Sequence, residues 1–350
     1  MFLNSLNHFR AVAILFIVAG HCFAVGVDGW RVNSFPEKLV ICLTTGGTAF
    51  FVFISGFLFY HLFYSNFNFL KFMKKKMAVV LVPYLILSTL TLLYFTLQNE
   101  TLPYVDYFFS GDGLVNEYIK PYFLYLATGA TWYAYWYIPF IMVIFFLSPL
   151  FIIFIETRLS YQLIAISILL LISMLMHRPA ENINVFQSVL YFSPVYMLGI
   201  LCAMKRQALY SYLKGKDYYL LGLALIIAGM QIGIYGTYEP FHKEPFEVGL
   251  PDLMLLQKVV LCLFFMIWLE RYQHIENRII SILASSSFAI YFLHPFIIKF
   301  FNELDILSRL HIPGGLQWPI ITVAVLVVSV FLAYLIRIIF SRSSRYITGW

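Results

Sequence analysis

Charged residues are scarce in this sequence. They make up 11% of its 350 residues, whereas an average soluble domain carries about 25%. So few charges cannot cover a water-facing surface, which excludes a soluble globular enzyme. The same scarcity excludes a disordered tail and a nucleic-acid-binding protein, despite the net charge of +6.

Cysteines are few, and the familiar cofactor motifs are missing. The four cysteines lie in apolar stretches without a Cys-x-x-Cys spacing, so we expect no disulfide framework and no metal site. The chain has no Gly-x-Ser-x-Gly elbow, no Walker A loop and no Gly-x-Gly-x-x-Gly. It also lacks buried acids and a clear internal repeat, which argues against an ion-coupled transporter. We expect no bound cofactor.

Long apolar runs are abundant instead. Hydrophobic residues reach 61% and aromatic residues 19%, which is typical of chains that contact lipid and headgroups. Because a bilayer core needs about 20 apolar residues per helix, the sequence predicts an all-α, polytopic membrane protein with a single domain over 1–350. Its ten transmembrane helices are expected near 11–27, 39–63, 77–97, 134–155, 159–176, 185–204, 218–238, 253–269, 279–301 and 316–336. The count could differ by one, since 117–129 also fits a short re-entrant or interfacial helix.

The distribution of lysine and arginine predicts the orientation. With the N-terminus in the cytoplasm, the inner segments carry a net charge of +11 and the outer segments −5. Both termini are therefore predicted to be cytoplasmic. The net charge of +6 follows from this topology and indicates no acidic partner.

Ionisable residues at membrane depth are costly and often functional. Arg10 and His21 are eleven residues apart, so they share one helix face about 16 Å apart along the axis. Arginine at the inner rim suits a phosphate-bearing ligand, and a deeper imidazole suits a general base or nucleophile. The alternative is a snorkelling arginine and a histidine satisfied by a neighbouring helix.

A second polar face lies in the ninth expected helix. Ser287, Tyr291 and His294 follow an i, i+4, i+7 spacing, and Pro295 removes a helical hydrogen bond directly after them. His294 is expected towards the outer leaflet. These residues either contribute to a site or join two helices through polar contacts.

Other polar and small residues have simpler explanations. Gly47, Ser55 and Gly56 favour close helix packing. The run Lys74–Lys75–Lys76 sets topology, but it also lies at the leaflet of Arg10. Lys258 is expected to snorkel to the outer surface.

These residues together resemble the acyltransferase-3 family, membrane-bound O-acyltransferases of surface carbohydrates. The Arg-x10-His spacing of Arg10 and His21 is similar to the hallmark of that family. Further similar segments are 47–58, 72–76 with 82–85, 136–139 with 148–150, and 287–295. The chain departs from the family in its all-lysine basic segment and in Tyr135, where many members have histidine.

The resemblance implies a donor and an acceptor. Acyl-CoA, with acetyl-CoA expected, would approach from the cytoplasm with its phosphates near Arg10 and the three lysines. His21 would act as general base or carry the acyl group, and Ser287, Tyr291 and His294 would line the acceptor side. The acceptor would be a sugar hydroxyl of a lipid-linked glycan or a polysaccharide, at the inner (plasma) membrane of a bacterium.

Two other functions remain open at the level of sequence. Some relatives are regarded as polysaccharide export components, so the protein could export a surface glycan without acyl transfer. A receptor or scaffold with aromatic outer loops is the weaker alternative.

Overall fold

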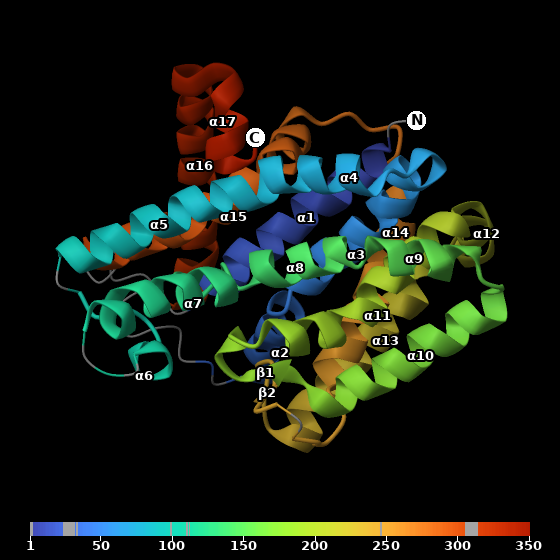
Figure 1. The fold of residues 1–350 in the computed structure, drawn as a ribbon. Helices are drawn as coiled ribbons and strands as arrows, with labels where there is room; N and C mark the ends of the chain where they lie inside the picture. The colour runs from blue at the N-terminus through green and yellow to red at the C-terminus, as the bar shows by residue number, and fades with distance from the viewer. Residues whose placement is uncertain are drawn as a thin grey trace.

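A computed structural model describes residues 3–23, 32, 34–98, 100–109, 111, 113–245, 247–304 and 314–350. Over these residues the regular elements are helices and two two-residue strands, and the all-α class that the sequence predicts is confirmed (Figure 1). The longer helices are α1 (Asn4–His21), α2 (Phe35–Thr44), α3 (Thr48–Leu58), α5 (Val82–Leu97), α8 (Tyr137–Phe146), α9 (Ser148–Glu156), α10 (Leu159–Met176), α11 (Val185–Met204), α13 (Asp217–Tyr235), α14 (Leu253–Glu270), α15 (Arg278–Glu303) and α16 (Gly314–Phe340).

Shorter elements connect them. The other α-helices are α4 (Phe69–Lys76), α6 (Val105–Phe108), α7 (Lys120–Thr128), α12 (Arg206–Leu213) and α17 (Ser344–Thr348), and the strands are β1 (Arg178–Pro179) and β2 (His242–Lys243). The π-helical segments are η1 (Phe59–Phe63), η3 (Met77–Leu81) and η4 (Val115–Ile119), and the 3-10 segments are η2 (Tyr64–Asn66), η5 (Ala180–Asn182) and η7 (Ser341–Ser343).

Eight helical stretches in the described residues are long and apolar enough to cross a membrane, or nine if the bent pair α8–α9 counts as one span. The protein is therefore a multi-pass integral membrane protein. Nine of the ten predicted stretches fall on these candidates. The remaining one, 11–27, begins within α1 and ends in residues outside the described part. Helix α1 carries Arg10 and two histidines in its 18 residues and is not among the candidates.

Two predicted spans are broken rather than continuous. The stretch 39–63 divides into α2 and α3 at Thr45–Gly47, where Gly46 has a φ of +77° that only glycine adopts easily. The stretch 134–155 divides into α8 and α9, which meet at an angle of 54° just before Pro149. Proline cannot donate the next helical hydrogen bond, so the helix bends there.

Helix α1 lies at the centre of the bundle, where it contacts α3, α14, α15 and α16 (Figure 1). Its buried side chains, including Phe9, Ile14 and Val18, belong to the main apolar core. The start of α1 and helix α17 lie on the upper side of Figure 1, and α6, β1 and β2 on the opposite side. The polar face of α1 is therefore enclosed by neighbouring helices.

Candidate active site

Helices α1 and α15 bring two groups of predicted residues together. Near the start of α1, Arg10 donates a hydrogen bond from Nη2 to Ser287 Oγ of α15 at 3.0 Å. Ser287 is 1% exposed and its hydroxyl donates in turn to the Ala284 carbonyl at 2.9 Å. Arg10 itself is half-buried, and Ser287, which we predicted on the acceptor side, lies at the arginine end instead. The two helices run parallel here, so the residues that follow on each remain side by side.

Towards the other end of the pair, two histidines face each other. The ring centroids of His21 and His294 are 5.4 Å apart with an interplanar angle of 29°. His294 is fully buried, and its Nδ1 lies 3.1 Å from the Ile290 carbonyl. Nδ1 must carry the proton to donate to this oxygen, which leaves Nε2 of a neutral ring as an acceptor. Nε2 has no hydrogen-bond partner in the described residues.

A tyrosine completes this group. Tyr133 lies in the turn between α7 and α8, and its ring centroid is 4.7 Å from that of His21 and 6.3 Å from that of His294. Sequence reasoning did not select Tyr133, because it lies in a turn where no helical spacing relates it to α1 or α15. The neighbouring Trp136–Pro139 motif was the available signal.

Tyr291 and Tyr135 fix the turn that carries Tyr133. The Tyr291 hydroxyl donates to the Ala134 carbonyl, and the Tyr135 hydroxyl donates to the Phe292 carbonyl at 2.8 Å. The hydroxyl of Tyr291, a predicted acceptor-side residue, is thus occupied by a hydrogen bond to the backbone of Ala134. Its ring, 6.0 Å from that of His294, still forms part of the wall around the histidines.

The three predicted lysines have different positions. Lys74 and Lys75 are exposed on α4. Lys76 is partly buried, with Nζ 4.2 Å from the centre of the Phe145 ring, and its charge acts on Arg10. The structure therefore brings Lys76 near the arginine end of the site.

The small residues of α3 lie at contacts with three different helices. A Cβ on Gly56 would be 2.0 Å from the Tyr196 carbonyl oxygen of α11, and one on Gly47 would be 3.1 Å from Phe16 Cβ of α1. The Ser55 side chain interacts with the Tyr137 hydroxyl of α8. All three stand where a larger side chain would separate helices that surround α1.

The comparison with known families decides the identity of this fold. Residues 3–338 match the acyltransferase domain of the acyltransferase 3 family. The chain belongs to the acyltransferase 3 family. No curated protein and no solved structure matches it. The protein is thus a membrane acyltransferase, which acts on an acyl donor and an acceptor.

The acyltransferase holds a buried arginine that sequence reasoning missed. Arg178 in β1 is 8% exposed, and its guanidinium carbon lies 4.9 Å from the centre of the Trp136 ring. Its charge acts on His21. A single arginine in the loop after α10 gives no periodic signal, so only the fold shows that its guanidinium lies against Trp136.

The position of the Lys258 side chain differs from the prediction. The prediction that it snorkels outward is wrong, because Lys258 is 2% exposed and Nζ donates to the carbonyls of Cys42 at 2.9 Å and Leu43 at 2.7 Å. The break between α2 and α3 leaves the last carbonyls of α2 without helical donors. The lysine ammonium supplies the missing hydrogen-bond donors, and its positive charge is favourable at a helix C-terminus.

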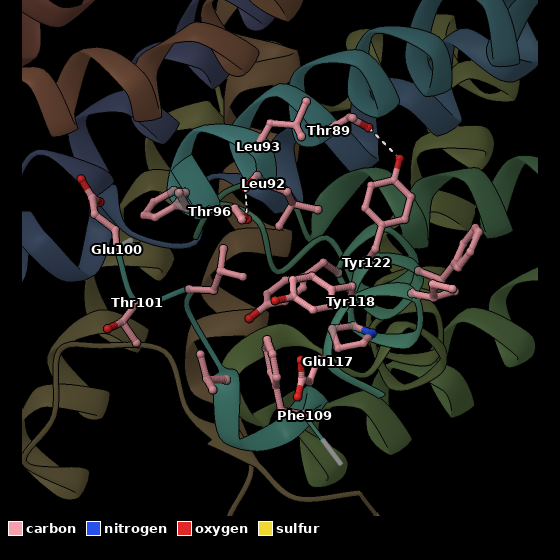
Figure 2. Close-up of a pocket in the computed structure, with 17 residues that line it drawn as sticks. Thr89, Leu92, Leu93, Thr96, Glu100, Thr101, Phe109, Glu117, Tyr118 and Tyr122 are labelled. Carbon is pink, nitrogen blue, oxygen red and sulfur yellow. Dashed lines mark hydrogen bonds between the residues drawn. The ribbon is translucent and has the colours of Figure 1, made fainter. Parts of the chain in front are cut away.

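A cavity of about 800 Å³ opens beside the C-terminal half of α5, between α5, α6, η4 and α7 (Figure 2). Apolar side chains such as Leu92, Leu93 and Phe109 line it, and Thr89 hydrogen-bonds Tyr122 at 2.9 Å along its wall. None of the predicted site residues borders this cavity. Across the described ranges, no three His, Cys, Asp or Glu side chains are grouped to hold a metal ion.

Proposed function

We propose that this acyltransferase transfers an acyl group, acetyl in the first instance, from cytoplasmic acyl-CoA to a sugar hydroxyl. The acceptor is a cell-surface polysaccharide or a lipid-linked glycan, and the enzyme works in the inner membrane of a bacterium. The observation that carries the proposal is the pairing of His21 with His294 on the same two helices that join Arg10 to Ser287.

The donor end of the site is the arginine end. A guanidinium binds phosphate oxygens through two parallel N–H donors, and Lys76 adds a second positive charge nearby. His21 follows about 16 Å further along α1, a distance that the extended pantetheine arm of CoA spans. Phosphates at Arg10 would therefore deliver the thioester to the histidines.

The histidine end supplies acid–base chemistry. In transfer, the acceptor hydroxyl oxygen forms a bond to the thioester carbonyl carbon, the C–S bond breaks, and the CoA thiolate leaves. The hydroxyl proton goes to His21 as general base and from there to the thiolate. In the covalent variant, His21 attacks the thioester first and passes the acyl group to the hydroxyl in a second step.

Purified protein in nanodiscs, supplied with radiolabelled acetyl-CoA and surface glycan from a deletion strain, tests the proposal. We expect His21→Ala and Arg10→Ala to reduce transfer at least a hundredfold, since positioned acid–base groups contribute about 10²–10⁴ in rate. The controls are His274→Ala and Arg278→Ala, both of exposed residues. Wild-type transfer rates in the His21→Ala protein would refute the assignment.

Two further readouts refine it. Label retained on the protein without acceptor identifies the covalent route, and its absence identifies the base route. In the deletion strain, surface glycan should lose ester-linked acyl groups and still reach the surface. Glycan retained inside the cell would support export in place of acyl transfer.

A further inference from the structure

Arg178 is a buried cation with no carboxylate in ion-pair contact among the described residues. Its Nη2 donates to Asn182 Oδ1 at 2.9 Å, while its Nε is buried and has no partner. Asp252 is the acid that acts on its charge. The oxygens of Asp252, however, accept hydrogen bonds from the Tyr191 hydroxyl at 2.7 Å and the Leu255 amide at 3.0 Å.

The loop that carries Arg178 is strained. Five non-glycine residues in the described part of the chain have positive φ, and three of them are His177 (60°), Glu181 (51°) and Asn182 (58°). Such conformations cost free energy, persist only where surrounding contacts enforce them, and cluster at functional sites. Two contacts hold the loop in place here: β1 pairs with β2, and His177 Nε2 lies 2.5 Å from the Leu250 carbonyl oxygen.

The strained loop places the arginine against Trp136, in the turn between α7 and α8 that also carries Tyr133. Its guanidinium stacks on Trp136, which follows Tyr133 by three residues, and Tyr133 in turn contacts the His21 ring. Burial lowers the pKa of the Arg178 guanidinium, although an arginine keeps its proton in proteins. A buried charge that cannot be neutralised needs a counter-charge, and among the described residues Asp252 acts on this one without an ion-pair contact.

We propose that Arg178 binds an anionic group of the acceptor, a carboxylate or a phosphate, and holds the acceptor beside His21. The proposal rests on the proposed function, because it assigns the acceptor side of the same site. The phosphates of the donor are assigned to Arg10, which lies about 16 Å from His21 along α1. Arg178 lies in the loop after α10, at the end of the bundle from which the acceptor is expected to enter.

Binding of simple sugars without any acyl donor tests this inference. Purified protein in nanodiscs is titrated with methyl glucuronide, which carries a carboxylate, with glucose 6-phosphate, and with neutral methyl glucoside. Tryptophan fluorescence is the readout, because the Trp136 ring lies against the guanidinium. We expect saturable binding of at least one charged sugar and at least tenfold weaker binding of the neutral one. The carboxylate and phosphate titrations distinguish an acidic sugar from a phosphorylated one.

Variants then locate the binding. Arg178→Gln should weaken binding of the charged sugar at least tenfold. The exposed Arg278→Gln, with the same change of charge, should not alter this affinity. If Arg178→Gln does not fold, Arg178→Lys decides the question. It keeps the charge without the two-pronged donor, so at least threefold weaker binding is expected.

Equal affinity of charged and neutral sugars would overturn the inference, as would unchanged affinity in the folded Arg178 variants. Because no acyl donor is present, this outcome is independent of the transfer assay. Loss of transfer in His21→Ala with intact sugar binding would support both assignments. Transfer that survives in His21→Ala would refute the proposed function without affecting the anion site.

Discussion

The hydrogen bond between Arg10 and Ser287 provides a test at the scale of one atom pair. Ser287→Ala removes the 3.0 Å contact that orients the guanidinium. Hydrogen bonds to charged groups contribute about 1.5–3 kcal/mol, and Arg10 is only half-buried, so the lower end applies. We expect the KM for acyl-CoA to rise about tenfold with kcat within twofold of wild type, since about 1.4 kcal/mol is a factor of ten.

Ser285→Ala is the matched control in this kinetic measurement. Ser285 lies two residues earlier on α15, is exposed, and donates only within its own helix, to the Ile282 carbonyl at 3.0 Å. Its KM should equal that of the wild type. If Ser287→Ala leaves the KM for acyl-CoA unchanged as well, the donor phosphates do not bind at this end of the helix pair.

Residues that a single helix relates were predictable, and residues that only the fold relates were not. The eleven-residue spacing placed Arg10 and His21 on one face, and the i, i+4, i+7 spacing grouped Ser287 with His294, because helix geometry fixes both. Tyr133 contacts the histidines from a turn and Arg178 contacts Trp136 from a two-residue strand, and no helical period applies to either. Lys258 was misjudged for a related reason, since the carbonyls it contacts belong to a break in another helix.

At the scale of elements, the contact between α3 and α11 depends on two glycines. A Cβ on Gly56 would lie 2.0 Å from the Tyr196 oxygen, and one on Gly199 would lie 2.1 Å from the Phe53 oxygen. Gly56→Ala must therefore push two backbones apart. Overpacking of this kind costs about 1–3 kcal/mol, so we expect a lower unfolding temperature of the purified protein in detergent.

Gly222→Ala is the opposite case within the same molecule. Gly222 lies in α13 with no atom within 4 Å of an added Cβ. Alanine there should leave the unfolding temperature unchanged or raise it, because glycine inside a helix is about 0.5–1 kcal/mol less favourable than alanine. Equal unfolding temperatures of the two variants would show that α3 and α11 are packed less closely than these distances indicate.

The elements themselves were predictable to the extent that hydropathy defines them. Nine expected spans match candidate spans because about 20 apolar residues are needed to cross a bilayer. Their breaks were not predicted, since the residues around Gly46 and Leu147 remain apolar on average. A break is decided by backbone conformation and by distant partners, such as the Lys258 ammonium that binds the end of α2.

At the scale of the whole molecule, the predicted topology rests on the leaflet distribution of lysine and arginine. The described structure places the start of α1 and helix α17 at one end of the bundle and the strands at the other (Figure 1). A single helix, α13, separates two exposed loop positions, Lys214 and Glu247, which the topology assigns to opposite sides of the membrane. These positions can be tested in cells.

The four native cysteines make this test direct, because all four are buried and free. In intact cells, a membrane-impermeant thiol reagent should label Glu247→Cys at the outer face and leave Lys214→Cys unlabelled. After permeabilisation both variants should react, and the wild-type protein should give only background labelling in either condition. Labelling of Lys214→Cys in intact cells, with Glu247→Cys protected, would invert the topology. The arginine end of α1 would then face outward, where acyl-CoA is not supplied, and the donor side assigned to Arg10 would be refuted together with the orientation.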